Sequence, residues 1–216
     1  MSDQRLPTMP SKADLVYDHV RQRILTGELQ PDQRLSMDAL ARELGVSKIP
    51  IREAMQRLES QGLVVQQQHA GPTVAAVNKQ QLAGVYLTRQ AIEPLAARLA
   101  APTITESALD GLDRVQMRMR EHLLEDSLEE LSQLNSAFHV AIAEATGYQI
   151  LIDFTESMLL SVRRYRVVEP LNRDNWRNVI AEHDAIVAAL RAHDPDAAAA
   201  ACLRHTASQF DHEMLP

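Results

Sequence analysis

Apolar residues recur every three or four positions along most of the chain, and this spacing predicts amphipathic helices. In the N-terminal third, three such runs each follow a serine, the residue type that favours a helix N-cap: Ser11, Ser36 and Ser47. These runs predict helices at residues 12–26, 37–44 and 48–60. Two short β-like segments, 63–65 and 73–75, predict a hairpin. Three helices followed by a hairpin indicate a winged helix-turn-helix.

Helix-period patterning continues almost unbroken from Asn78 to the C-terminus. Segments 103–106 and 127–130 have the spacing of a capping box, in which a Thr or Ser and a Glu three residues later satisfy the first N–H groups of a helix. The predicted helices end near Ala100, Glu125, Gly147 and Arg166, and two more begin at Asp174 and Pro195. About six helices of this kind predict an antiparallel bundle.

The fold class is therefore mainly α, with two domains. Residues 1–78 are expected to form the winged helix-turn-helix, and residues 79–216 are expected to form the all-α bundle. The composition, 45% hydrophobic and 24% charged, is that of an ordinary folded protein. The N-terminus lacks the apolar segment of a secretory signal, and no apolar run reaches membrane-spanning length, so we expect a cytoplasmic protein without a membrane partner.

The charge distribution differs between the two predicted domains. The net charge is −7, which argues against a protein that coats nucleic acid over its whole surface. Residues 1–78 hold nine basic and nine acidic side chains, so all the excess acid lies in residues 79–216. Any nucleic-acid contact is thus expected from a local surface of the first domain.

The first turn of the third predicted helix carries side chains suited to reading DNA. Lys48 and Arg52 are four residues apart and share a helical face, and Gln56 lies one turn further along it. Arg52 can donate two parallel hydrogen bonds to a guanine edge, and Ile49 can pack on a thymine methyl group. The alternative is that both cations are solvated surface charges. Their position in a helix-turn-helix favours the reading role.

In the second domain, four side chains have a spacing that allows them to share an ion. Asn135 and His139 are four residues apart on one helix face. His183 and His205 are equidistant from residue 194, at the turn between the last two helices, so they lie at the same height in a helical hairpin. Three imidazoles and an amide oxygen would bind a divalent transition metal, zinc or nickel being the expected ions. The alternative is that each histidine is an ordinary hydrogen-bonded residue.

The first predicted domain carries a family resemblance. Residues 40–58 read LARELGVSKIPIREAMQRL, with GLV at 62–64, and this segment closely resembles the GntR family of bacterial transcription regulators. The resemblance implies DNA contacts from Ser47, Lys48, Ile49 and Arg52 and from the wing tip, here His69 and Gly71. Two positions depart from the family pattern. Lys48 stands where arginine is usual, which should alter base preference, and Asp38 stands where one subgroup has a DNA-contacting arginine.

The second domain resembles the effector-binding FCD domain of the FadR-like branch, through the segments at 135–139, 182–186 and 203–205. That family holds a metal with an Asp and three His, whereas here the neutral Asn135 replaces the Asp, so weaker metal affinity is expected. The resemblance also implies a small carboxylate effector, and Arg89 matches the position that holds its carboxylate. The alternative for Arg89 is a surface pair with Glu93, four residues on.

Together these observations predict a ligand-responsive transcription regulator: a homodimer that binds a near-palindromic double-stranded DNA operator. Two alternatives remain. A metal-dependent hydrolase is conceivable because three histidines with an open coordination position can activate water. We expect no enzyme, however. Glu182 and Asp184 flank His183 in sequence, but neighbouring helix positions should point in other directions, and no other base is evident. The second alternative is a regulator whose bundle only dimerises.

Overall fold

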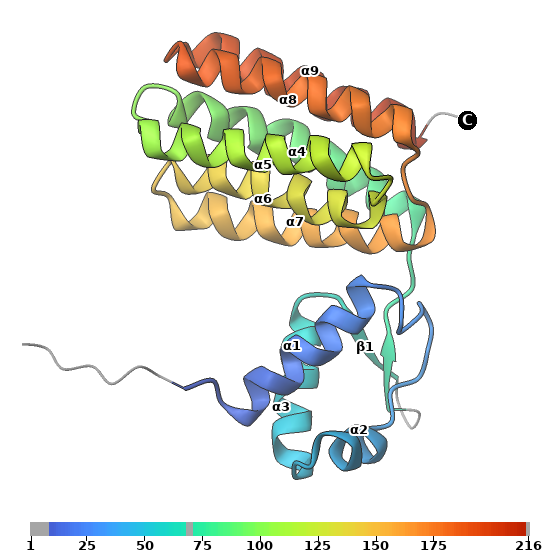
Figure 1. Ribbon diagram of the computed structural model, residues 1–216. Coiled ribbons are helices and arrows are strands. Elements are labelled where there is room, and N and C mark those ends of the chain that lie inside the picture. The colour runs from blue at the N-terminus through green and yellow to red at the C-terminus, as the bar shows by residue number, and fades with distance from the viewer. Residues whose placement is uncertain (1–8, 68–70, 215–216) are drawn as a thin grey trace, which may run out of the picture. The chain divides into compact units, whose positions relative to one another are not determined.

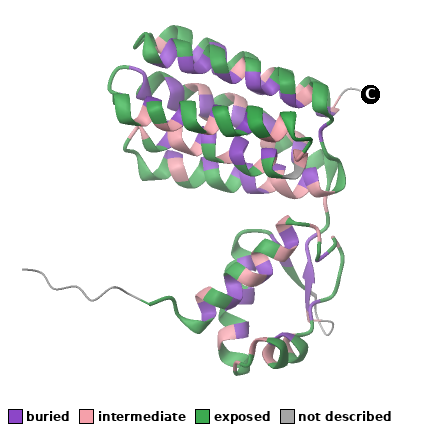
Figure 2. Ribbon diagram, viewed as in Figure 1, coloured by how far each residue is buried: buried purple, intermediate pink, exposed green. Residues whose placement is uncertain are grey.

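The chain divides between Val77 and Asn78 into two units, each with its own core (Figure 1). The computed structural model describes residues 9–67 and 71–214. In both units, buried residues form stripes along the helices and exposed residues cover the opposite faces (Figure 2), as amphipathic sequences require. The mainly helical fold class predicted from the sequence is confirmed.

The first unit, called the head below, has three helices and a hairpin. These are α1 (Lys12–Leu25), α2 (Met37–Leu44), α3 (Lys48–Ser60), β1 (Val64–Gln67) and β2 (Gly71–Val74). The strands are antiparallel, with Val64 opposite Val74. Helix α3 buries Ile51, Ala54, Met55 and Leu58 and packs mainly on α1. The head is thus a winged helix-turn-helix with its polar α3 face turned to solvent.

The turn between α2 and α3 depends on a glycine. Gly45 follows α2 with φ +63°, a left-handed conformation that L side chains rarely adopt. Its N–H donates to the carbonyl of Ala41, which closes the last turn of α2. This turn sets the position at which α3 begins.

The second unit, called the bundle below, contains six α-helices and one 3₁₀ helix in the described residues. They are α4 (Lys79–Ala100), α5 (Glu106–Leu124), η1 (Leu128–Glu130), α6 (Leu131–Glu144), α7 (Gln149–Val168), α8 (Arg173–Arg191) and α9 (Pro195–Met214). Helix α4 packs most extensively on α9 and also contacts α7. None of the described helices combines the length and apolar character that crossing a membrane requires.

At both predicted capping boxes, the helix cap in the structure differs from the predicted one. The N-cap of α5 is Thr105 rather than Thr103, and its hydroxyl accepts a hydrogen bond from the N–H of Ala108. Ser127 makes no side-chain cap, because a 3₁₀ turn precedes α6 there. Several Thr, Ser and Glu residues compete within a few positions, so the pattern alone did not fix which one caps the helix.

Candidate functional site

The opening turn of α3 presents polar side chains to solvent. Lys48 and Ile49 are exposed, as are Arg52 and Gln56 one and two turns further along the helix. Ser47 is the N-cap residue, and its side chain makes no capping hydrogen bond. The structure therefore brings these predicted DNA-contacting residues together at one accessible end of α3.

The wing contributes one residue that can be placed. Gly71 begins β2 with φ +85° and pairs with Gln67 across the hairpin. The other predicted wing contact, His69, lies outside the described residues. The positive φ explains a glycine at this position, because a side chain there would be strained.

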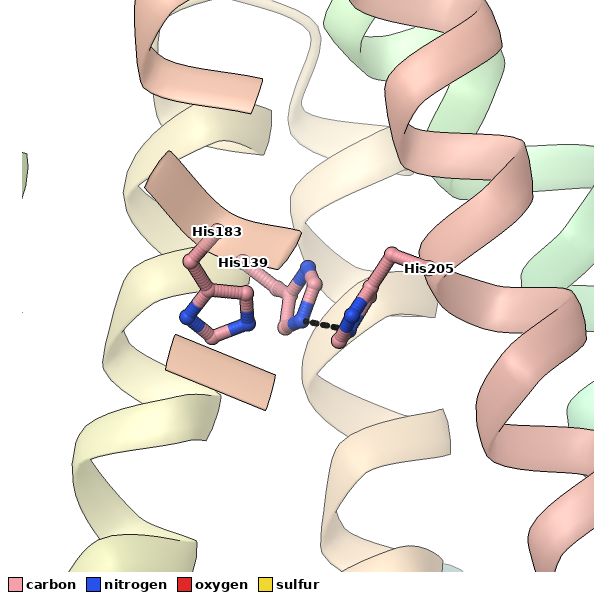
Figure 3. Close-up of side chains that lie close together, drawn as sticks. All are labelled: His139, His183 and His205. Carbon is pink, nitrogen blue, oxygen red and sulfur yellow. Dashed lines mark hydrogen bonds between the residues drawn. The ribbon is translucent and has the colours of Figure 1, made fainter. Parts of the chain in front are cut away.

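Inside the bundle, three histidines from three helices converge (Figure 3). They are His139 on α6, His183 on α8 and His205 on α9, all of them buried. One nitrogen from each ring lies within 4.8 Å of the others. The Nε2 atoms of His139 and His205 are 3.1 Å apart, the contact drawn as a dashed line in Figure 3. The cross-helix approach of His183 and His205 expected from the hairpin midpoint is thus present.

The outer nitrogen of each ring has an oxygen partner. His139 Nδ1 lies 3.1 Å from Glu93 Oε2, and His205 Nδ1 lies 2.8 Å from Glu182 Oε2. His183 Nδ1 lies 3.1 Å from Gln116 Oε1. The amide nitrogen of Gln116 donates to Ile180 and Asp184, which fixes its oxygen toward His183. Because carboxylate and amide oxygens only accept hydrogen bonds, each Nδ1 must donate.

In a neutral imidazole that donates from Nδ1, Nε2 carries a lone pair, and in this cluster Nε2 faces inward. Burial, followed by the charge of nearby groups, lowers the pKa of His139 and His183 well below the usual value, so both rings are neutral at pH 7. The Nε2 atom of His183 is buried without a hydrogen-bond partner, and the Nε2 atoms of His139 and His205 face each other at 3.1 Å. A cation held between the three rings would satisfy all of these nitrogens, whereas a proton on one ring would satisfy the His139–His205 pair alone.

The donor set fits a transition metal. Imidazole nitrogen is a preferred ligand of zinc and nickel, and ligating histidines usually donate their second nitrogen to a carboxylate or carbonyl, as here. Two nitrogens bound about 2.1 Å from one ion lie roughly 3.0–3.4 Å apart. The 3.1 Å separation of His139 and His205 is close to that value. Phe138 stacks on His183 with ring centroids 3.9 Å apart, which holds that ring in place.

Arg89 does not lie on the surface, which corrects the alternative interpretation of that residue. The predicted pair with Glu93 is present, with Arg89 Nε 2.5 Å from Glu93 Oε1, but the two side chains are only 1% and 3% exposed. Glu93 contacts Arg89 and His139 at the same time. The carboxylate therefore links the arginine to the histidine cluster.

A small cavity of about 10 Å³ adjoins this link. Its lining includes Arg89, Asn135, Arg163 and Arg166 together with Ser132 and Ser136. Arg166 is itself paired with Glu213 and donates a hydrogen bond to the Tyr86 hydroxyl. The cavity is therefore rich in hydrogen-bond donors, while the charges of two of its arginines are balanced by buried carboxylates.

The sequence reasoning missed the oxygen partners of the imidazoles. Glu182 was expected to point away from the histidines, yet its carboxylate contacts His205 on the neighbouring helix. Glu93 and Gln116 come from α4 and α5, far from the histidines in sequence. For these partners, the sequence held one relevant pattern, the four-residue spacing of Arg89 and Glu93. That spacing predicted an Arg89–Glu93 pair but not the contact of Glu93 with His139.

Two families match this chain. Residues 84–208 match the FCD domain, and residues 12–74 match the bacterial regulatory proteins of the gntR family. This chain belongs to the GntR family and carries an FCD domain. The GntR match spans the three head helices and the hairpin, and the FCD match includes all three clustered histidines. Members of this family are transcription regulators, and FCD domains bind small-molecule effectors.

Relatives cover nearly the whole chain. The HTH-type transcriptional regulator LutR of Bacillus subtilis strain 168 is 30% identical over 210 residues, covering 87% of this chain and 94% of that protein. McbR of Escherichia coli K12 is 27% identical over 183 residues, covering 84% and 83%. The solved structure of E. coli McbR/YncC matches with a TM-score of 0.82 and 25% identity, covering 95% and 98% of the two chains. The family resemblance predicted from the sequence is confirmed.

Replacing Glu93 with leucine is expected to cost about 3–5 kcal/mol of folding free energy, because the Arg89 charge is then buried without its partner. The double variant Arg89→Met/Glu93→Leu removes both charges and should cost less than Glu93→Leu alone. Urea unfolding of the full chain in the presence of EDTA measures the free energy of unfolding of both variants. Asp113→Ala is the control, since it breaks the exposed pair with Arg191 and should cost under about 1 kcal/mol. Equal costs for Glu93→Leu and Asp113→Ala would contradict the prediction.

Proposed function

We propose that this chain is a ligand-responsive transcription regulator that reads a double-stranded DNA operator with the opening turn of α3. The observation that carries the proposal is the exposure of Lys48, Ile49 and Arg52 at the start of the second helix of a helix-turn-helix. A helix in the major groove contacts base edges from its N-terminal residues. Ser47, Gln56, His69 and Gly71 are the further contacts that we propose.

Arg52→Ala is expected to weaken operator binding by about 1–3 kcal/mol, because one two-pronged contact to a guanine edge is lost. The operator is first selected from random duplexes with the wild-type chain, and affinity is then measured by fluorescence anisotropy. Arg57→Ala removes the same charge from the last turn of α3 and serves as the control. Unchanged operator affinity for Arg52→Ala would exclude Arg52 as a base reader.

We further propose that His139, His183 and His205 hold a divalent transition metal, zinc or nickel, with Asn135 as a fourth ligand. The proposal is supported by the three inward Nε2 atoms and their oxygen-bonded Nδ1 atoms. When bound, the ion supplies a Lewis-acidic centre that attracts an anionic oxygen. The amide of Asn135 brings no negative charge, so we expect weaker retention than with a carboxylate.

The chain supplied with zinc or nickel is expected to hold about one ion after desalting, because three preorganised imidazoles can bind the same ion. His183→Ala should lose most of this metal, as measured by elemental analysis. The control is His212→Ala, which removes an exposed histidine outside the cluster. Equal metal contents in the two variants would contradict the assignment. Circular dichroism verifies that both remain folded.

The effector that we propose is a small carboxylate. Support comes from the cavity lined by Arg89, Arg163 and Arg166 and from the proposed metal beside it. To regulate, the effector must bind two conformations of the chain unequally. We propose that the change is carried by α4, because this helix contains Arg89 and directly follows the head in sequence.

We expect at least one small carboxylate to raise the melting temperature of the metal-loaded chain. The compounds tested, one at a time, are acetate, lactate, malonate and citrate. A ligand at 100 times its Kd stabilises a protein by about 2.7 kcal/mol. The corresponding neutral amides are the matched controls and should give no shift. Absence of any carboxylate response, together with absence of metal, would favour a bundle that only dimerises.

We propose that the regulator is a homodimer. Helices α4 and α7 pack on each other, and both leave large apolar side chains exposed: Leu87, Leu95 and Leu99 on α4 and Ile150 and Phe154 on α7. A two-fold dimer would cover such a surface and present two heads to a palindromic operator. Selected operators without two-fold symmetry would contradict the dimer.

We also infer a cytoplasmic location and no catalytic role. Glu93 and Glu182, the described carboxylates in contact with the cluster, each accept a hydrogen bond from an imidazole Nδ1. Neither is thus placed as a free general base, which weighs against the hydrolase alternative. The relatives named as transcription regulators support the same conclusion.

A further inference from the structure

An acidic side chain lies on the proposed reading surface. Asp38, the second residue of α2, places its Oδ1 2.6 Å from Nζ of Lys48, the first residue of α3. The side chains of Lys48 and Asp38 are 60% and 66% exposed, so the pair is open to solvent. If Lys48 reaches DNA as proposed, the carboxylate of Asp38 reaches it too.

A carboxylate at this place opposes DNA binding in general. In a helix-turn-helix, the first helix of the motif crosses the DNA backbone, so the start of α2 faces phosphates. Attraction between cations and phosphates is the main source of sequence-independent affinity. The Lys48 ammonium, by hydrogen bond and then by charge, lowers the pKa of the Asp38 carboxyl, which favours the carboxylate form beside the lysine. A Lys48 ammonium paired with Asp38 is partly neutralised toward phosphates.

A purely structural reason for Asp38 also exists. An acidic residue in the first turn of a helix interacts favourably with the helix dipole. That role predicts an effect on stability and none on DNA binding. The two roles can therefore be separated by measuring affinity and stability on the same variants.

We propose that Asp38 is a specificity-determining residue, which restrains Lys48 and thereby lowers affinity for DNA of any sequence more than affinity for the operator. Discrimination is a difference of affinities, and an element that weakens wrong complexes widens it. At the operator, Lys48 exchanges its carboxylate partner for a base edge. The inference rests on the proposed DNA-reading function of α3.

The first test compares wild type with Asp38→Asn on a random duplex and on the selected operator over a salt series. If Asp38→Asn frees Lys48 to contact one phosphate, the slope of log affinity against log salt concentration on random DNA becomes steeper by about 0.9. The variant then loses about 3.5-fold more affinity than wild type between 50 and 200 mM salt. It should bind random DNA more tightly at low salt, and its operator-to-random affinity ratio should fall.

Two control variants exclude simpler causes. Asp18→Asn makes the same charge change at an exposed position on α1 and should leave the salt slope as in wild type. Asp38→Glu keeps the charge beside Lys48 and should also keep the wild-type slope. If the salt slope on random DNA steepens equally in Asp18→Asn, the effect comes from overall charge, and the proposal is overturned.

A double-mutant cycle tests whether Asp38 acts through Lys48. In a Lys48→Met background, Asp38→Asn should leave the salt slope unchanged, because no lysine remains to be freed. If Asp38→Asn changes the salt slope as much in the Lys48→Met background as in wild type, the proposal is overturned. It is also overturned if Asp38→Asn weakens operator binding but leaves the salt slope on random DNA unaltered, because that result indicates a direct base contact by Asp38. If wild type binds no DNA at all, the proposed function itself fails. If wild type binds and Asp38→Asn behaves identically, only this inference fails.

Discussion

Glu93 is a carboxylate buried among helices, and its charge must be balanced inside the bundle. Arg89 balances it from one turn earlier on α4, and His139 donates to it from α6. A charge in this environment is tolerated only when it is paired and fully hydrogen-bonded. The same contact therefore fixes three things at once: the conformation of Arg89 at the cavity, the orientation of His139, and the packing of α4 against α6.

That arrangement makes the cavity and the histidine cluster interdependent. An anion that draws Arg89 toward the cavity competes with Glu93 for the guanidinium, and any shift of Glu93 alters the hydrogen bond that holds His139. A cation held by the histidines strengthens the donor character of their Nδ1–H groups and so favours Glu93 in its present position. Coupling between two binding events is reciprocal. If the proposed metal and the proposed carboxylate both bind here, we expect each to change the affinity of the other through Glu93.

Sequence reasoning worked where a local rule has a direct geometric consequence. Equal distances of His183 and His205 from a turn place them at the same height of a hairpin, and the hydrophobic period located the helices to within a few residues. It failed where partners come from distant elements. Contact of Glu93 with His139 depends on how α4 packs on α6, and contact of Glu182 with His205 depends on the rotation of α8 against α9. Spacing along one helix does not encode these packing angles.

The head and the bundle use charge in opposite ways. The bundle buries two ion pairs, Arg89–Glu93 and Arg166–Glu213, besides pairs that lie exposed on its surface. The charged groups around the start of α3, in contrast, remain in water and contribute little to folding. Nine basic and nine acidic side chains in residues 1–78 leave the head without net charge. Its attraction for phosphates is therefore limited, and tight binding must come from base contacts made in a single register. One short helix reads few base pairs, so the proposed homodimer, with two heads on one operator, would supply affinity that a single head lacks.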